Sequence, residues 1–163
     1  SYVRLAKKQE TYLINKFLAM SLKKDFNSLR DKSFVQVEKD QITDLILSRN
    51  GITDQITKAG EVWQSQNGTI LDSLQINNYI DKLTSLNGST FSESTAIGAD
   101  SHELQIALSN GENIAINASI IEENNFRMTS SSEPQNIFES NENGLFKQVF
   151  TDLEELLKPQ IEG

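Results

Sequence analysis

The feature that most constrains the fold of this chain is a pattern that recurs along it: two short β-strands joined by a tight turn, then an amphipathic helix. The middle copy pairs residues 42–47 with residues 53–58 across Asn50-Gly51, and a helix over residues 74–86 follows. An Asn-Gly pair favours a tight hairpin because both positions tolerate a positive φ. The pattern predicts antiparallel strands and helices that are mixed along the sequence.

The same pattern occurs before and after the middle copy. The first copy has strands over residues 2–5 and 11–14 and a helix over residues 16–30. The third copy has strands over residues 104–108 and 113–116, joined by Asn110-Gly111, and a helix over residues 145–157. The three units span residues about 1–37, 38–91 and 100–158. This order suggests an internal duplication.

The fold class that follows is α+β, with repeated β-hairpin–helix units and one or more antiparallel sheets whose helices pack on one face. The helix over residues 74–86 has the clearest apolar stripe: Ile76, Tyr79, Ile80, Leu83 and Leu86. Asp72 or Ser73 is expected to cap its start, and Asn87-Gly88 to end it in the left-handed conformation. Further strands are expected at Trp63 and over residues 34–37, 120–121, 126–128 and 136–138.

The length of 163 residues suits a single α+β domain with its own core. The chain begins at Ser1, inside a predicted strand, so we expect a fragment of a longer chain from which any N-terminal anchor has been removed. The polar stretch over residues 88–101 is expected to be a connection, with Phe91 holding it to the core.

The composition excludes several classes of site and partner. The net charge of −8 repels phosphate, so nucleic acid is not an expected partner. The chain has no cysteine, which excludes disulfides, thiolate chemistry and cysteine-based zinc sites. No phosphate-binding loop or dinucleotide motif is present, and we expect no cofactor and no metal ion.

Catalytic residues are not evident in the sequence, and we expect that the protein is not an enzyme. His102 is the single histidine, lies in no recognisable motif, and is expected on the surface at the start of a strand. Carboxylates are abundant, but acid–base hydrolysis needs two of them facing each other across a cleft. A hydrolase with paired carboxylates is therefore kept only as a third class of function.

Four residues are candidates for contact with a partner or ligand: Arg30, Asp31, Lys32 and Trp63. A charged trio at a helix end can instead cap the last carbonyl groups of that helix. A lone tryptophan after a hairpin more commonly fills the core between sheet and helix than forms a ligand platform. Both interpretations stay open for each candidate.

The sequence resembles the bacterial domain of unknown function 4340. The resemblance runs from Tyr2 to about Leu157 and rests on these elements in order: Tyr2-Val3-Arg4-Leu5, Thr11-Tyr12-Leu13, Leu29-Arg30-Asp31-Lys32, Ile42 to Leu45, Trp63 and a helix ending near Phe91. Members of that family commonly carry one N-terminal membrane anchor, with the domain outside the cytoplasmic membrane. Many are encoded beside an ABC-type transport system related to gliding-motility components.

The resemblance implies an extracytoplasmic accessory domain that binds other proteins, such as ABC transporter membrane subunits, and it assigns no catalytic residues. The alternative function is a module that binds a small ligand or a polysaccharide. That alternative predicts a concave pocket with exposed aromatic side chains such as Trp63, Tyr79 or Tyr2.

Overall fold

The structure is a computed structural model that describes residues 2–4, 11–13, 26–96 and 98–158. The chain forms two compact units, Ser1–Asp31 and Lys32–Gly163. Each unit is described by itself. The core and the candidate site below belong to the second unit.

The first unit contains a small hairpin. Strand β1 (Tyr2–Arg4) pairs antiparallel with β2 (Thr11–Leu13), and Tyr2 lies opposite Leu13. This confirms the first predicted hairpin. A short 3-10 helix, η1, follows (Phe26–Leu29). The rest of the helix expected over residues 16–30 lies mainly outside the described residues.

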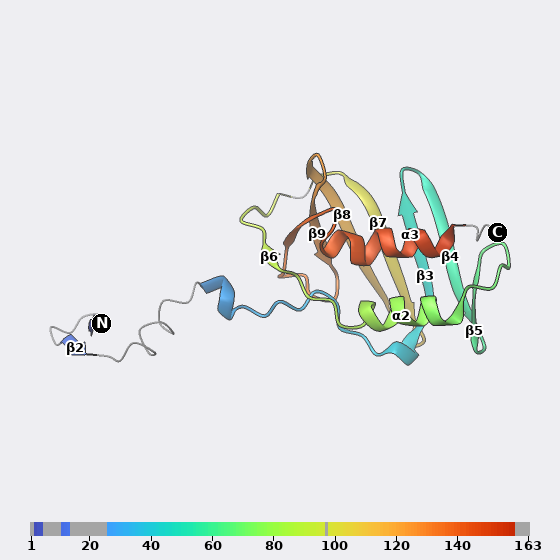
Figure 1. Cartoon of the computed structure of the whole chain (residues 1–163), viewed down its shortest axis with the longest axis horizontal. Helices are drawn as coiled ribbons and strands as arrows, with labels where there is room; N and C mark the ends of the chain where they lie inside the picture. Colours follow the sequence, from blue (N-terminus) through green and yellow to red (C-terminus); the bar gives the residue numbers. More distant parts are fainter. Residues whose placement is uncertain (1, 5–10, 14–25, 97, 159–163) are drawn as a thin grey trace. The chain divides into compact units, whose positions relative to one another are not determined.

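The second unit is built on one eight-stranded sheet in which every pair of neighbouring strands is antiparallel (Figure 1). The strands lie in the order β5-β4-β3-β7-β8-β9-β10-β6. Their bounds are β3 Ile42–Arg49, β4 Ile52–Ala59, β5 Val62–Ser65, β6 Thr90–Phe91, β7 Asp100–Leu108, β8 Asn113–Glu122, β9 Asn125–Ser130 and β10 Phe138–Asn141. A short 3-10 helix, η2 (Lys39–Gln41), leads into β3.

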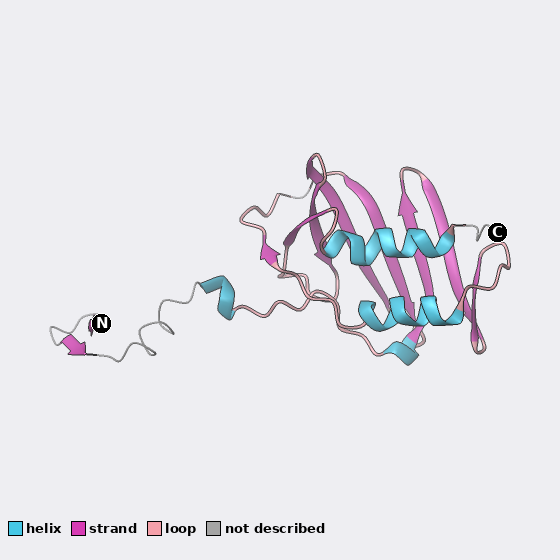
Figure 2. Ribbon diagram, in the orientation of Figure 1, coloured by secondary structure: helices cyan, strands magenta, loops and turns pink. Residues whose placement is uncertain are grey.

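The prediction of an α+β fold made of repeated hairpin–helix units is wrong. The two Asn-Gly hairpins exist, but β3 pairs with β7, so the second and third copies merge into one continuous sheet. After β8 the chain adds β9 and β10 as a meander before any helix begins. The described part of this unit is therefore mostly antiparallel sheet with two short helical segments (Figure 2).

The first of these segments, α2 (Ser73–Leu83), begins where Asp72 caps it, because the Asp72 carboxylate accepts a hydrogen bond from the Gln75 N–H at 2.8 Å. The cap was predicted, but the predicted end was wrong. The helix stops at Leu83, and Gly88 does not adopt a positive φ. The carbonyl of Leu86 instead accepts hydrogen bonds from a separate segment of the chain.

That separate segment was predicted to be a strand over residues 34–37, and this prediction is wrong. The N–H groups of Phe34 and Val35 both donate to the carbonyl of Leu86, at 2.8 and 3.2 Å. Both side chains are completely buried. The segment thus crosses the end of α2 and contributes to the core without joining the sheet.

The second helical segment is continuous and consists of a π-helical part, η3 (Lys147–Thr151), and α3 (Asp152–Leu157). It packs against α2 and against β7. Both helices cover the same face of the sheet (Figure 1). The core lies between this face and the helices.

The alternation of side chains along the strands explains which face is covered. Leu45 and Leu47 on β3 lie opposite Ile106 and Leu104 on β7, and all four side chains are buried under the helices. The intervening side chain of Ile46 points to the other face and is half-buried. The covered face is therefore apolar, as period-2 alternation requires.

Candidate functional site

A groove of about 580 Å³ lies at one end of the helical layer. Its lining residues come from the start of α2, the end of α3 and the strands β4 and β5. These residues line it: Asp54, Ser65, Gln66, Asn67, Thr69, Ile70, Leu71, Asp72, Gln75, Leu156, Leu157 and Lys158. We call this feature the helix-end groove.

One wall of the helix-end groove is a short segment that extends the sheet. After β5 the chain turns at Gly68, which has a φ of +79°. The Ser65 N–H then donates to the carbonyl of Thr69, and the Leu71 N–H donates to the carbonyl of Trp63, both at 2.9 Å. We call residues 69–71 the edge segment, because these bonds place it outside β5.

The helix-end groove has an apolar floor, and exposed apolar side chains lie close to it. Leu71, Leu156 and Leu157 are partly buried against the core and form the floor. Ile70 on the edge segment lines the groove and is 64% exposed, and Leu74, which precedes the lining residue Gln75 in the first turn of α2, is 72% exposed. Exposed apolar side chains beside a concave surface are typical of sites that bind other molecules.

The sequence contained a weak signal for these two exposed apolar residues. Leu74 lies outside the apolar stripe of its helix, which begins at Ile76. Ile70 is an apolar residue two positions after Gly68 of the Asn67-Gly68 turn, where polar residues are usual. Neither residue was singled out, because an isolated exposed apolar side chain is common on protein surfaces.

A charged cluster connects the helix-end groove to the sheet. Asp54, which lines the groove, accepts a hydrogen bond from the guanidinium of Arg49 at 2.7 Å. The Nε atom of Arg49 also lies 3.3 Å from the carboxylate of Glu154 on α3. The arginine side chain is largely buried, so this three-residue contact holds the end of α3 on the sheet.

His102 belongs to the same region. It lies near the start of β7, as predicted, but the prediction of an exposed side chain is wrong, because the side chain is mostly buried. Its side chain is 15% exposed, and its Nε2 atom lies 3.8 Å from the Glu154 carboxylate. The ring packs against Phe146 and Phe150 at centroid distances of 4.9 and 5.3 Å. Burial lowers the pKa of His102, Glu154 opposes this effect, and Arg49 adds to it.

The alternation of side chains along β7 could have predicted that His102 lies on the buried face of the sheet. It lies two residues before Leu104 and four before Ile106, so the period of a strand places all three side chains on the same face. Because that face is buried, the imidazole is buried with it. The prediction failed because β7 starts at Asp100, earlier than expected.

The arrangement around His102 does not have the geometry of a catalytic triad. Ser101 lies 3.0 Å from Nδ1 of His102, but its hydroxyl donates to the carbonyl of Ala118 at 3.1 Å within the sheet. The 3.8 Å separation from Glu154 is too long for a hydrogen bond. The cluster is suited to attaching α3 to β7.

The hydrolase class requires two carboxylates that share a substrate. Asp54 and Glu154 lie on either side of Arg49, and the guanidinium of Arg49 contacts both carboxylates. Among the described residues, no group of three or more His, Cys, Asp or Glu side chains could hold a metal ion.

The four residues predicted from the sequence are divided between the two units of the chain. Arg30 and Asp31 belong to the first unit, and Lys32 begins the second. The Nη1 atom of Arg30 donates to the side chain of Asn27 at 3.3 Å, and the Lys32 carbonyl accepts from the Gly88 N–H at 2.9 Å. Whether this charged trio contacts a partner remains a prediction.

Trp63 lies in the core of the second unit and is 5% exposed. Its carbonyl supports the edge segment, but its indole does not line the helix-end groove. Tyr79, the other described aromatic residue of the ligand-binding alternative, is also buried. The side chain of Tyr2 lies outside the described set.

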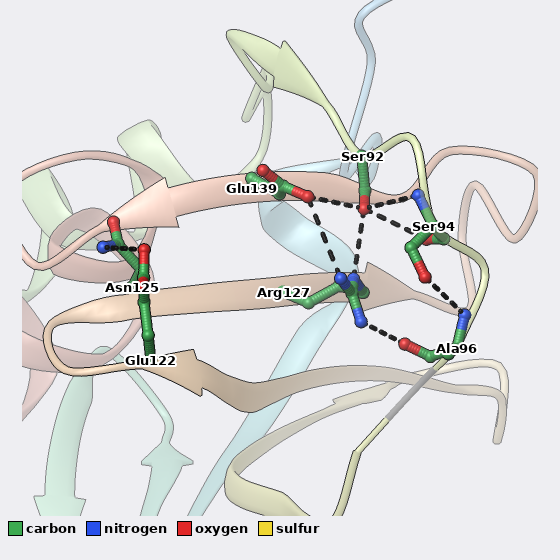
Figure 3. A network of polar contacts seen from close by, with 7 residues as sticks. All are labelled: Ser92, Ser94, Ala96, Glu122, Asn125, Arg127 and Glu139. Atoms are coloured by element: carbon green, nitrogen blue, oxygen red, sulfur yellow. Dashed lines mark hydrogen bonds and ion pairs between the residues drawn. The ribbon is translucent and has the colours of Figure 1, made fainter.

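A second polar cluster holds the connection after β6 onto the sheet (Figure 3). Arg127 on β9 donates from Nε to the Ser92 hydroxyl at 3.1 Å and from Nη1 to the carbonyl of Ala96. The Ser92 hydroxyl also donates to Glu139 on β10 at 2.8 Å. Because the arginine side chain is 12% exposed and its donors are engaged, this cluster has a structural role.

No helix in the described parts of the chain is both long enough and apolar enough to cross a membrane. Neither a curated protein nor a solved structure matches the chain. The sequence model of a family described as "Domain of unknown function (DUF4340)" matches residues 1–105, more than half of the chain. The match covers the first unit, the hairpin β3–β4, the helix-end groove up to Gln75, and α2. The protein therefore belongs to the DUF4340 family.

Proposed function

We propose that this chain is a non-catalytic protein-binding domain, that it works outside the cytoplasmic membrane as part of a membrane-anchored protein, and that its partner is a membrane subunit of an ABC-type transport system. The observation that carries the binding role is the helix-end groove, in which the lining residue Ile70 is an exposed apolar side chain. A buried apolar centre within a polar rim is the usual composition of a protein interface.

The rigidity of the groove supports a binding role. Its walls come from three elements that are held to one another by the edge-segment hydrogen bonds and by the contact of Arg49 with Glu154. A preformed surface loses little conformational entropy when it binds, which favours association. The polar residues Gln66, Asn67 and Gln75 form the rim around the apolar floor.

The location and the transport partner are supported by the family to which the chain belongs and by its charge. The resemblance described above implies a domain outside the membrane in a protein that is commonly encoded beside an ABC-type transport system, and this supports the location and the partner. A net charge of −8 disfavours direct adsorption to anionic lipid. We therefore assign the contact with the membrane system to protein partners.

Binding of a small ligand or polysaccharide is the second candidate, because a volume of about 580 Å³ is in the range of small-molecule sites. The fluorescence of Trp63 can be used to detect a ligand in the groove, because the carbonyl of Trp63 holds the edge segment in place. Titration of the domain with oligosaccharides should leave tryptophan fluorescence unchanged if the groove is a protein interface. A saturable shift of the emission would favour the ligand-binding role.

The test of the proposed function is site-specific photocrosslinking in cells that express the full-length, membrane-anchored protein. A photoreactive amino acid is placed at Leu74, which lies in the sequence between the groove-lining residues Asp72 and Gln75, and at Gln105, an exposed position in the middle of the sheet on the face opposite the helices. We expect an ABC transporter membrane subunit to be captured from Leu74 and not from Gln105. Equal capture from both sites, or none from a well-expressed protein, would contradict the proposal.

A further inference from the structure

The edge segment leaves one residue with both backbone hydrogen-bonding groups directed away from the sheet. Ile70 lies opposite Gln64, and the hydrogen bonds between the two strands are made by the flanking residues, Ser65 with Thr69 and Leu71 with Trp63. In an antiparallel ladder, this pattern means that Gln64 and Ile70 direct their N–H and C=O groups away from each other. The backbone groups of Gln64 face β4, where Gln64 lies opposite Thr57. The backbone groups of Ile70 face solvent, on the outer side of the sheet.

The edge segment lacks two of the features that proteins use to block strand pairing, a charged side chain and a proline. Within the described residues, neither backbone group of Ile70 forms a hydrogen bond. The segment is short, because a single bridge between Gln64 and Ile70 holds it to β5, and it presents an exposed β-branched residue. Another strand can therefore pair with it over a short stretch centred on Ile70.

We propose that the edge segment binds an extended stretch of a partner protein, which pairs with Ile70 as an added β-strand and inserts an apolar side chain into the helix-end groove. This proposal rests on the proposed function, because it specifies which kind of protein segment the groove binds. The recognition is by main-chain hydrogen bonds for affinity and by alternate side chains for specificity.

The geometry of the sheet determines which side chains of the partner strand would contact this domain. Leu71 lies on the face covered by the helices, so a partner residue opposite Leu71 would point toward the floor formed by Leu156 and Leu157. The partner residue opposite Ile70 would point to the other face and pack against the Ile70 side chain. Two adjacent apolar or β-branched residues are therefore expected in the partner strand.

Charge determines what flanks these two residues. Two carboxylates, of Asp54 and Asp72, and one basic side chain, of Lys158, line the groove, and the whole chain carries a net charge of −8. Lysine or arginine beside the paired residues would be attracted, whereas an acidic segment would be repelled. The occupant that fits is thus a basic, extended, apolar-containing segment.

The test uses random peptides displayed on phage and selected on the whole chain, followed by synthesis of the enriched peptides. Ile70→Pro removes the outward N–H without removing a hydrogen bond inside the domain, and Ile70→Val keeps that N–H. We expect the enriched peptides to be basic, to bind Ile70→Val normally, and to lose affinity for Ile70→Pro by about tenfold or more. N-methylation of the peptide should weaken binding at alternate residues only, since alternate N–H groups face the edge.

Enriched peptides that bind wild-type protein and Ile70→Pro equally, or a selection that yields no peptide dependent on Ile70, would overturn strand addition. Thermal unfolding of Ile70→Pro is recorded in parallel, so that a folding defect is recognised. The peptide N-methylation experiment uses the wild-type domain, so it still tests strand addition if Ile70→Pro fails to fold.

Crosslinking from Leu74, repeated in the Ile70→Pro background, separates the two proposals. A transporter subunit that is captured equally with and without the Ile70 N–H would overturn strand addition and leave the proposed function in place. Loss of capture in Ile70→Pro, with Ile70→Val unaffected, would support both. Peptides that depend on Ile70 while no subunit is captured from wild-type protein would support strand addition and overturn the transporter assignment.

Discussion

The hydroxyl of Tyr79 on α2 donates a hydrogen bond of 2.7 Å to the main-chain carbonyl of Val149 in the π-helical part of the last helix. This contact joins the two segments that cover the sheet, and it lies in the core. Burial raises the pKa of Tyr79 well above its ordinary value, and Asp152 adds to this effect. The hydroxyl therefore stays protonated and remains a donor at every pH at which the protein is folded.

Tyr79→Phe should lower the free energy of unfolding by about 1 kcal/mol, because the ring still fills its site while one buried hydrogen bond is lost. Urea denaturation measures the change. Asn78→Ala, at the exposed neighbouring position of α2, is the control and should stay within about 0.5 kcal/mol of wild type. Equal stability of Tyr79→Phe and wild type would mean that the contact between the helices contributes nothing.

Acidification should destabilise the protein through His102. Its pKa is lower in the folded state, because burial disfavours the imidazolium, than in the unfolded state, where it is ordinary. The contribution to stability is therefore complete above about pH 6.5, the ordinary pKa of histidine, and is lost as the pH falls through the lowered folded-state pKa. Urea denaturation from pH 7.5 to pH 5.5 should show this decline.

His102→Gln provides the comparison, because glutamine retains polarity and cannot be protonated. The free energy of unfolding of this variant should change less over the same pH range. The folded-state charges that face His102 are Glu154 on α3 and Arg49 on β3, and neither is altered by the substitution. Identical pH profiles for the two proteins would show that another group controls the decline.

Local sequence patterns predicted the hairpins because their turn chemistry is strictly local. Asn50 and Gly51 adopt φ values of +49° and +78°, and Gly111 adopts +86°, as tight hairpins with Asn-Gly turns require. Alternating side chains then fixed the strands on either side. These features need no knowledge of the rest of the chain, so they were predictable.

The pairing of strands from different hairpins was not predictable in this way. The joining of β3 to β7 places Leu47 opposite Leu104 across more than fifty residues of sequence, and no local pattern encodes that choice. The prediction of where α2 ends failed for a related reason. Leu86 continues the apolar stripe, but its carbonyl bonds to Phe34 and Val35, so a tertiary contact ends the helix earlier.

The candidate site depends even more on these distant contacts. Ile70 is recognisable as a rim residue only when the edge segment is placed outside β5, and the groove floor needs Leu156 from the far end of the chain. Trp63 was a reasonable candidate because tryptophan is common in binding sites, but its alternation in β5 directs it to the covered face. Sequence spacing alone could not separate these outcomes.

Arg127 should control the mobility of the connection that follows β6. Arg127→Ala removes the bonds to Ser92 and to the carbonyl of Ala96, so amide hydrogen exchange over residues 94–96 should accelerate by about tenfold or more. The loss of charged hydrogen bonds should also cost about 1.5–3 kcal/mol of stability. Exchange that is unchanged in these residues would show that the connection is held by other contacts.

Arg127→Lys is the matched control for that substitution. Lysine keeps the positive charge beside Glu139, whereas it lacks the planar set of donors that reaches Ser92 and Ala96 together. Exchange in this variant should fall between wild type and Arg127→Ala. A lysine variant identical to wild type would indicate that charge alone holds the connection.

Gly88 is required because it packs directly against the ring of Phe138, and a Cβ atom at this position would overlap that ring. Phe138 is completely buried and also contacts Phe91 at a centroid distance of 4.6 Å, so it cannot move aside. Gly88→Ala should therefore destabilise the protein by about 2 kcal/mol or more. Gly98→Ala is the control, because its Cβ would make only an ordinary contact of 3.7 Å with Ser119.

A double-mutant cycle tests whether this steric relationship is the cause. Phe138→Leu shortens the side chain that the methyl group added by Gly88→Ala would strike, and by itself it costs stability because it leaves space in the core. The loss of stability in the double variant should be smaller than the sum of the two single losses by about 1 kcal/mol, since each change relieves the defect of the other. Strict additivity of the two free energies would show that Gly88 is needed for its backbone conformation and not for the close approach of Phe138.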